Sequence, residues 1–556
     1  MVLMFIAMAV TVLAEELKPV QAPVAGIQTA APAQATQAPT GEALSPHGGP
    51  GTRLRVREAG YPLAGGALLK EGMTQAPMND NGPKGLNVHS PHSGREGEAP
   101  TALLKEGATQ ASMNDNGPKG LNVHSPHSGR EGETLAAMPT EGATQAPLID
   151  TGDTAWVLIS SALVLLMTPG LAFFYGGMTG RKNVLGILMQ CFTILCVISI
   201  QWVLFGYSLS FAPGNSFWGS LEWAGLKDVG FGPFKDYAAT IPHQLFMVFQ
   251  MMFAIITPAL MIGAFAERMK FSAFLMFMVL WATFVYDPVC HWVWGIGGWL
   301  KGLGALDFAG GTVVHINAGA AALMVAVFIG TRKGGGHKAI LPHNLPFTIL
   351  GTALLWFGWF GFNAGSSLGA NGLAVNAFVV TNTAAAAAGL SWALIDWIFN
   401  EKPTMLGMAT GAVAGLVAIT PAAGYVSAPS AIIIGVIVSI LCYIAVTLIK
   451  PKFGYDDALD VFGVHCIGGV WGALATGLFA SKAVNPAGAD GLFFGNPKLF
   501  LVQLIATCIT LAYSFVMSLV IYKIIDTAIG VRVKEKDELM GLDLTQHHEN
   551  AYTIIE

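Results

Sequence analysis

Long apolar segments alternate with short polar connections from Asp153 to Ile525, after a leading region that is mostly polar. A helix of roughly 20 apolar residues spans a bilayer core, and eleven segments of about that length follow one another here. The pattern predicts an all-α polytopic membrane protein with eleven transmembrane helices. The predicted spans are 154–176, 184–210, 243–265, 271–290, 309–330, 345–366, 374–399, 404–421, 429–449, 461–480 and 498–525.

The composition agrees with this prediction. Of the 556 residues 53% are hydrophobic and only 11% are charged, which is far from the average of a soluble domain. The net charge of -5 is small, and the chain has no run of Lys and Arg interleaved with aromatic residues. Nucleic-acid binding is therefore excluded as a function class.

The first 150 residues differ in character from the rest. Residues 1–14, "MVLMFIAMAVTVLA", form a short apolar run that predicts a signal peptide. Residues 15–150 are rich in polar and helix-breaking residues and contain a unit of 35 residues that begins at Ala67 and returns at Ala102. A solenoid would need an apolar face, so we expect a disordered, repeat-containing region, with metal binding by its "NVHSPHSG" elements as an alternative. The remaining domains are 153–525, which holds the predicted spans, and 526–556, a tail.

Positive charge predicts the orientation of the spans. The loops that follow odd-numbered spans carry ten Lys and Arg residues, whereas the loops that follow even-numbered spans carry five. By the positive-inside rule the N-terminus lies outside and the C-terminal tail lies in the cytoplasm. We therefore expect a multi-pass protein of the cell inner (plasma) membrane.

Two short patterns recur across the spans. "ITPA" begins at Ile256 and again at Ile419, and the pair Asp307 and His315 has a looser counterpart in Asp460 and His465. The members of each pair lie five spans apart, so the paired spans cross in opposite directions. This predicts two inverted five-helix repeats plus a final helix, an arrangement that places a substrate path at the repeat interface.

Two histidines, His315 and His465, lie inside predicted spans. An ionisable residue within the membrane is a functional candidate, the alternative being a neutral ring that binds a helix carbonyl. Two imidazoles at matching places would meet near the axis and offer a donor and an acceptor to a small molecule. Metal sites recruit several closely spaced ligands, and each His here stands alone, so a metal-dependent membrane enzyme is the less favoured alternative.

Aromatic side chains form a second group of candidates. Phe249 and Phe253 share one helix face, as do Phe362 and Ser366, and Trp294 follows the fourth span. Rings around a hydroxyl can hold a small cation by cation–π attraction. Asp307 begins the fifth span, where it would cap the helix and favour a cation by its field. The tryptophans interpreted as packing or interfacial residues are Trp292, Trp299, Trp356 and Trp359.

Several long motifs resemble the ammonium transporter (Amt/MEP/Rh) family. They include "FYGGMTGRKNVL", "GAFAERMKFSA", "DFAGGTVVHINAG", "LPHNLP", "GWFGFNAGS" and "DDALDVFGVHCIGG", and the resemblance covers residues 153–552. It implies a homotrimer of eleven-helix subunits, each with one narrow apolar pore, that transports ammonium or ammonia, is not an enzyme and needs no cofactor.

By motif, the resemblance assigns roles to individual residues. Phe253, Trp294 and Ser366 would form the outer ammonium site with Asp307 supporting it, Phe253 and Phe362 would form the gate, and His315 and His465 would line the pore. Trp294 and Ser366 are similar to the bacterial Amt branch, whereas Asp287 stands where an uncharged residue is expected.

Three further expectations concern the tail and the kind of function. Residues 530–552 resemble the family's regulatory tail, which implies contact with trimer neighbours and a PII signalling protein, the alternative being a solvated charged tail. An ammonium sensor with little flux is an alternative function, although no recognisable output domain follows the eleventh span. An Rh-like gas channel is another, against which Trp294 and Ser366 count.

Overall fold

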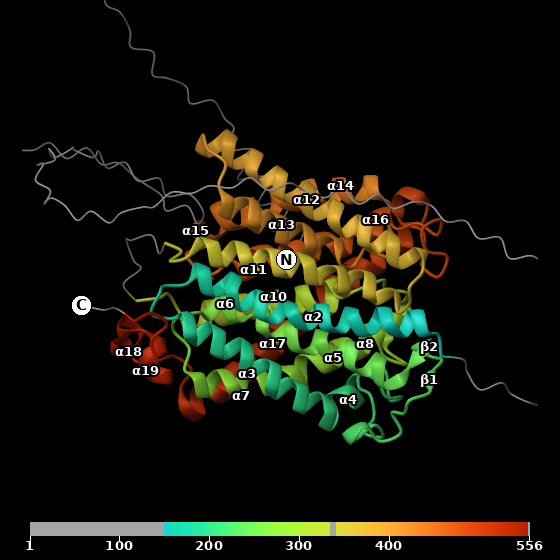
Figure 1. The fold of residues 1–556 in the computed structure, drawn as a ribbon, viewed down its shortest axis with the longest axis horizontal. Helices are drawn as coiled ribbons and strands as arrows, with labels where there is room; N and C mark the ends of the chain where they lie inside the picture. Colours follow the sequence, from blue (N-terminus) through green and yellow to red (C-terminus); the bar gives the residue numbers. More distant parts are fainter. Residues whose placement is uncertain (1–148, 334–340, 554–556) are drawn as a thin grey trace, which may run out of the picture. The chain divides into compact units, whose positions relative to one another are not determined.

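The structure is a computed structural model in which residues 149–333 and 341–553 are described. The predictions for the signal peptide and for the repeats therefore lie outside the described residues. The described part is a bundle of long helices with one short hairpin, β1 (Pro233–Phe234) and β2 (Ala238–Pro242), at one end (Figure 1).

Ten of the described helices are long and apolar enough to cross a membrane. Each predicted span coincides with a helix, which confirms the fold class. The helix at the eighth predicted span, α13 (Met405–Ile419), has only 15 residues, so the count of eleven crossings stays a prediction. The ten are Thr151–Met178, Val184–Phe211, His243–Phe265, Phe271–Leu303, Gly311–Ile329, Leu345–Ser367, Gly372–Asn400, Ala428–Phe453, Phe462–Phe479 and Pro497–Ile529.

These spans are built from shorter helical elements. In the first repeat the elements are α2 (Thr151–Met178), α3 (Val184–Gln201), α4 (Tyr207–Phe211), α5 (His243–Leu260), α6 (Ile262–Phe265), α7 (Phe271–Trp281), α8 (Asp287–Trp294), α9 (Trp299–Leu303) and α10 (Asn317–Ile329). After it come α11 (Leu345–Ala364), α12 (Gly372–Asn400), α13, α14 (Ala428–Ile444), α15 (Lys450–Phe453), α16 (Ile467–Phe479), α17 (Pro497–Ile529), α18 (Glu535–Met540) and α19 (Leu542–His547).

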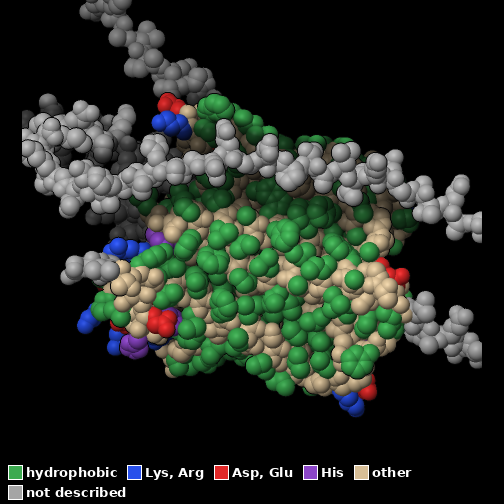
Figure 2. Space-filling view, viewed as in Figure 1, with side chains coloured by type: hydrophobic (Ala, Val, Ile, Leu, Met, Phe, Trp, Pro, Cys, Tyr) green, Lys and Arg blue, Asp and Glu red, His purple; other side chains and the backbone are tan. Residues whose placement is uncertain are grey.

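The surface of the bundle is apolar along its length. Figure 2 shows hydrophobic side chains spread across the helices, with the charged side chains gathered towards the ends. Lipid offers no partner to polar groups, so an apolar girdle between polar ends is what a membrane-spanning bundle requires.

Wider π-helical turns interrupt several spans. Such turns are rare and often occur at functional sites, because they break the regular hydrogen-bond register. Two of them begin the fifth and tenth spans and contain His315 and His465. The π-helical turns among the described residues are Trp202–Gly206, Ala282–Tyr286, Gly311–Ile316, Ala445–Ile449 and Phe462–Cys466.

Reciprocal hydrogen bonds tie the two halves together. The N–H of Phe308, before the first His-bearing turn, donates to the carbonyl of Pro421 over 3.2 Å. The N–H of Leu459, before the second, donates to the carbonyl of Gly263 over 3.1 Å. Each His-bearing helix is thus joined to the end of the "ITPA" helix of the other half, as inverted repeats require.

The structure corrects the predicted counterpart of Asp307. Asp307 lies eight residues before His315, and the residue eight before His465 is Asp457. One carboxylate oxygen of Asp457 accepts the N–H of Phe462 over 2.7 Å at the start of the second π turn. Asp460 instead pairs with Lys450 at 2.6 Å. The pairing of Asp307 with Asp460 was therefore wrong.

The C-terminal tail packs against one end of the bundle, which we call the tail face: residues 179–183, 266–270, 330–333 and the tail from Gly530. The carboxylate of Asp543 accepts the N–H of Gly186 over 2.8 Å, and Leu542 donates its N–H to Asn183 over 2.7 Å. The described tail is therefore held by the bundle, in contrast to the alternative of a free solvated segment.

An ion cluster joins Glu267 and Arg332 of the tail face to Asp456. Arg332 contacts Asp456 at 2.9 Å and Glu267 at 3.3 Å, and all three side chains are mostly buried. Burial alone would raise the pKa of Asp456, but the hydrogen bonds and charge of Arg332 outweigh it and lower that pKa to about 2. The ionised carboxylate therefore stabilises the fold above the ordinary pKa of an aspartate.

This cluster predicts a loss of stability in acid. Because the pKa of Asp456 is about 2 in the fold and about 4 in an unfolded chain, its contribution disappears as the pH falls from about 4 to about 2. We expect Asp456→Asn to lower the free energy of unfolding at neutral pH by about 2 kcal/mol. The variant should also lose less stability between about pH 4 and about pH 2, which we call the acid limb. Thermal unfolding midpoints in detergent at several pH values test it, with the exposed Asp236→Asn as control. An acid limb as steep in Asp456→Asn as in the parent protein would contradict the prediction.

Candidate functional site

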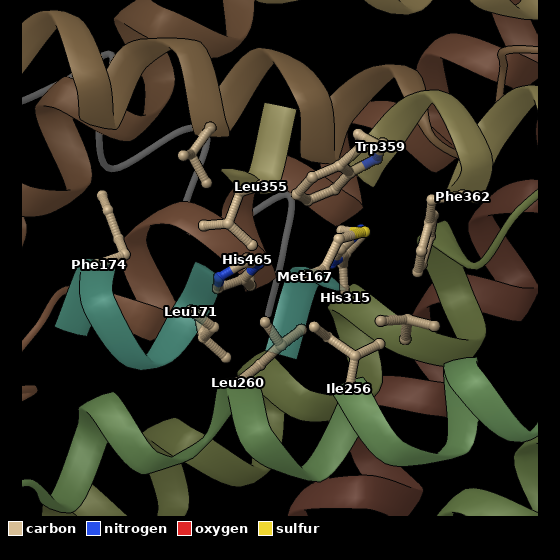
Figure 3. Close-up of a pocket in the computed structure, with 12 residues that line it drawn as sticks. Met167, Leu171, Phe174, Ile256, Leu260, His315, Leu355, Trp359, Phe362 and His465 are labelled. Atoms are coloured by element: carbon tan, nitrogen blue, oxygen red, sulfur yellow. The ribbon is translucent and has the colours of Figure 1, made fainter. Parts of the chain in front are cut away.

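A narrow cavity lies between the two halves of the bundle. Its wall comes from α2, α5, α11, α13 and both π turns that carry histidine, and the side chains converge on it from all sides (Figure 3). Apart from the two imidazoles the wall is apolar. The lining residues are Met167, Leu171, Phe174, Ile256, Leu260, Val314, His315, Leu355, Trp359, Phe362, Val413 and His465.

The two histidine rings lie against each other in this cavity. Their centroids are 5.4 Å apart and their planes differ by 18°, and both side chains are buried. Both ring nitrogens of His315 and Nδ1 of His465 have no hydrogen-bond partner within the protein. The alternative of a ring that is satisfied by a helix carbonyl therefore does not hold for His315. Its nitrogens remain available to a small molecule that donates and accepts hydrogen bonds.

Glycines allow the two histidine-bearing helices to approach closely. A Cβ on Gly319 would lie 2.5 Å from the backbone nitrogen of Cys466, and a Cβ on Gly469 would lie 3.0 Å from Cβ of His315. Small residues at a helix crossing permit this approach in membrane proteins. The stacking of the two imidazoles therefore depends on glycine at both positions.

The volume of the cavity is sufficient for about one small molecule. The space open to the centre of a water-sized molecule is about 10 Å³, close to the minimum that admits one water. A hydrated ion does not fit such a space, whereas one neutral molecule about the size of water does.

Two phenylalanines close the cavity at its end nearest His315. The rings of Phe253 and Phe362 are 4.2 Å apart at 33° to each other, and each side chain is only 1% exposed. Phe362 also lies 6.2 Å from the ring of His315. The structure therefore brings the predicted gate and pore residues into one continuous series of ring contacts.

The remaining predicted residues lie beyond the phenylalanine pair. The indole of Trp294 meets Phe253 edge-on at 6.0 Å, and its N–H donates to the backbone carbonyl of Asp307 over 2.8 Å. Ser366, one turn after Phe362, donates its hydroxyl to the carbonyl of Phe362 over 2.8 Å. Its oxygen lone pairs remain able to accept a hydrogen bond from a ligand. The ring of Phe249 packs against the ring of Phe253, with their centroids 5.1 Å apart.

Asp307 caps the first His-bearing turn. Its carboxylate accepts four backbone N–H groups, from Gly310, Gly311, Thr312 and Val313, over 2.7 to 3.1 Å. Burial raises its pKa above the ordinary value, against the lowering effect of these N–H donors. The side-chain carboxylate of Asp307 is thus occupied by backbone N–H groups. The backbone carbonyl of Asp307 accepts the hydrogen bond from Trp294 and so links Asp307 to the residues beyond the phenylalanine pair.

Two residues have roles that the sequence interpretation did not give them. Trp359, interpreted as packing or interfacial, lines the cavity and stacks on His315 at 5.5 Å and 21°. Its position three residues before Phe362, on the same helix face, is the signal that could have found it. Asp287, which stands where an uncharged residue is expected, is fully buried and accepts hydrogen bonds from Gln201 at 2.8 Å and Ser210 at 3.3 Å.

The site holds few groups that could bind a metal or cofactor. Within residues 149–333 and 341–553, no three His, Cys, Asp or Glu side chains are arranged to hold a metal ion. What the geometry supports is an aromatic cluster with a hydroxyl, then a closed pair of phenylalanines, then two imidazoles in an apolar path.

Comparison with known proteins places this arrangement among transporters. The profile described as Ammonium Transporter Family matches residues 155–552. An ammonium transporter of Bacillus subtilis is 58% identical over 401 residues, which are 72% of this chain and 98% of the relative. Ammonium transporter Amt1 of Archaeoglobus fulgidus is 50% identical over 404 residues, 72% of this chain and 99% of the relative. A crystal structure of Candida albicans Mep2 is similar with a TM-score of 0.67 at 39% identity, covering 72% and 90% of the two chains.

The close glycine contact yields a prediction. Gly319→Ala would place a methyl group 2.5 Å from the backbone of Cys466, so the two helices must separate, at a cost of about 1 to 3 kcal/mol. We expect a lower thermal unfolding midpoint and a lower transport rate. Gly302→Ala is the control, because a Cβ there meets nothing within 4 Å. Equal midpoints and rates for the two variants would show that the approach of the helices is not tight.

Proposed function

Because this chain belongs to the ammonium transporter family and transports ammonium, we propose how the described residues perform that transport. Ammonium binds between Phe253, Trp294 and Ser366, gives up a proton before the pair of Phe253 and Phe362, and crosses as ammonia past His315 and His465. The observation that carries the proposal is the stacked pair of unpartnered imidazoles in an otherwise apolar cavity, directly behind the closed phenylalanines.

Capture relies on the aromatic rings outside the gate. A desolvated cation gains about 0.5 to 2 kcal/mol at the face of an aromatic ring, and the hydroxyl oxygen of Ser366 accepts one N–H of the ligand. The N–H of Trp294 is already occupied by the carbonyl of Asp307, so the indole presents its ring and not a competing donor. Asp307 is thus a positioning residue, which orients Trp294 and the start of the His-bearing helix.

Deprotonation follows from the cost of moving charge. Transfer of a small bare ion into a low-dielectric interior has an idealised cost on the order of 20 kcal/mol, which two aromatic contacts do not offset. Transfer of one proton to a water molecule on the outer side of the gate converts ammonium to neutral ammonia and leaves hydronium outside, which removes this cost from the path. Potassium has the charge and nearly the size of ammonium but no proton to lose, so the same wall excludes it.

The two imidazoles supply hydrogen bonds in place of those that ammonia loses when it leaves water. Ammonia both donates and accepts hydrogen bonds, and an apolar path of this length would leave those groups unpaired at a cost of several kcal/mol. His315 and His465 face each other at 5.4 Å and supply a donor and an acceptor in one place. They carry no metal or cofactor in this scheme, and no covalent step is needed.

The tail is suited to regulate this path. Arg532 donates to the carbonyls of Ile329 and Thr331, at the end of the span that carries His315, and it pairs with Glu538 of α18 at 2.9 Å. Displacement of α18 would therefore act on that helix. We propose that a PII signalling protein contacts this tail in the cytoplasm.

We also propose that three copies assemble in the cell inner membrane, each with its own pore and with its N-terminus outside. The end of α12 supports a partner surface, since it exposes three large apolar side chains in succession. They are Trp397 at 60%, Ile398 at 74% and Phe399 at 70%.

Loss of either imidazole tests the pore. A lost hydrogen bond to ammonia in a buried site is worth about 1 to 3 kcal/mol, so His315→Ala and His465→Ala should each lower ammonium uptake by reconstituted vesicles about tenfold or more. His343→Ala is the control, because this imidazole lies outside the cavity and contacts Thr179 and Tyr552. Uptake at the parent rate in both pore variants would refute the imidazole role, and ammonium binding without uptake by the parent protein would favour the alternative of a sensor.

The outer site has a separate test. Removal of the indole ring in Trp294→Leu should raise the ammonium concentration at half-maximal uptake about two- to thirtyfold, because the cation loses one aromatic face. The maximal rate should change less than this concentration does. Phe231→Leu, which replaces a 77% exposed aromatic ring outside the site, should leave the half-maximal concentration unchanged. A half-maximal concentration that is the same in Trp294→Leu and the parent would exclude the ring from capture.

A further inference from the structure

The long helix α17 carries its polar residues on its buried side. Five polar residues spaced three or four apart lie on one face, and each is at most 1% exposed. The opposite face exposes large apolar residues, including Leu501, Ile505, Ile509, Val516 and Val520. We call the buried polar row the seam; it consists of Gln503, Thr507, Thr510, Ser514 and Ser518.

The seam runs in register with the chain segment that leads into and out of the first His-bearing π turn. Gln503 accepts the N–H of Leu306 over 2.9 Å and donates to its carbonyl over 2.7 Å. Ser514 donates to the carbonyl of Asn317 over 2.7 Å. Both pairs are separated by 197 residues, so the two segments run parallel, and the seam residues between these bonds lie beside the π turn Gly311–Ile316.

Between these two anchored points, three buried polar atoms have no partner within the protein. They are Oγ1 of Thr507, Oγ1 of Thr510 and Oδ1 of Asn317, on side chains that are 0% exposed. The other end of the Asn317 amide donates to the carbonyl of Val313 over 3.2 Å. That bond fixes the amide, so its oxygen is the atom left to accept a hydrogen bond.

The hydroxyls of the two threonines also make no hydrogen bond to a backbone carbonyl of their own helix. A helical threonine usually donates to the carbonyl four residues earlier, and Thr257, Thr381, Thr476 and Thr527 all do so here. Thr527 belongs to the same helix α17. Thr507 and Thr510 make no such bond, and an unmade bond of a buried hydroxyl costs about 1 to 3 kcal/mol.

We propose that Thr507, Thr510 and Asn317 bind ordered water behind the first π turn, and that this water holds the turn and so the direction of the His315 ring. A buried water needs two to four polar partners, and two hydroxyls and an amide oxygen supply them. The evidence for the water site comes from the unpartnered polar atoms alone. The effect of this water on transport rests on the proposed function, in which His315 lines the pore.

The double variant Thr507→Val with Thr510→Val separates this proposal from a dry contact. If water is bound, the variant removes its partners and leaves the Asn317 amide oxygen unpaired, so the unfolding midpoint in detergent should fall by about 2 to 6 °C. If the contact is dry, the methyl groups replace two unpaired hydroxyls, and the midpoint should rise. Thr527→Val is the control on the same helix, and the double Ser variant should restore the parent value.

The same variants test the positioning effect. We expect ammonium uptake by the double Val variant to fall about tenfold and uptake by the double Ser variant to stay near the parent rate. An unchanged or raised midpoint overturns the water site. A lowered midpoint with parent-like uptake, while His315→Ala loses uptake, overturns only the positioning effect. If His315→Ala transports at the parent rate, the pore proposal fails and the positioning effect fails with it. The water site is then tested by the unfolding midpoint of the double Val variant alone.

Discussion

The cost of placing charge in a low-dielectric interior is the constraint on which this structure depends. A bare cation between Phe253, Phe362 and the apolar wall would lose its water and gain only weak ring contacts. The cavity behind them admits about one water-sized molecule and offers hydrogen-bonding groups only at His315 and His465. Transport of ammonium through such a path is explained if the charge is removed before the gate.

A second constraint is the fit of the two halves. Each His-bearing π turn is capped by an aspartate that lies eight residues before the histidine, and each is tied by a backbone hydrogen bond to the end of the "ITPA" helix in the other half. Glycine at 319 and 469 lets these helices meet at their backbones. The imidazole pair is therefore a product of the repeat interface and not of either half alone. The final helix α17 stands outside both repeats and contacts the first turn through its buried polar face.

Much of the fold could be predicted from the sequence, because a bilayer leaves few alternatives to apolar helices of spanning length. All eleven predicted segments are helices, and His315 and His465 stood out as isolated ionisable residues in them. The π turns could not be predicted, since a shift of hydrogen-bond register has no composition of its own. Asp457 was missed because the comparison paired Asp307 with Asp460, although only Asp457 has the same eight-residue spacing to its histidine. Trp359 and the seam depend on which helix face is buried, and a span of α17's composition does not reveal that face by itself. The packing of the tail depends on single bonds such as that of Asp543 to Gly186, which no spacing indicates.

The central claim is that the pore selects by deprotonation and not by the size of the bound ion. The most direct measurement is uptake of potassium and of ammonium by vesicles that contain the parent protein, at equal concentration gradients and membrane potential. The account predicts ammonium uptake without potassium uptake, while added potassium competes for the aromatic site and raises the half-maximal ammonium concentration. Potassium uptake at a rate comparable to that of ammonium would contradict it.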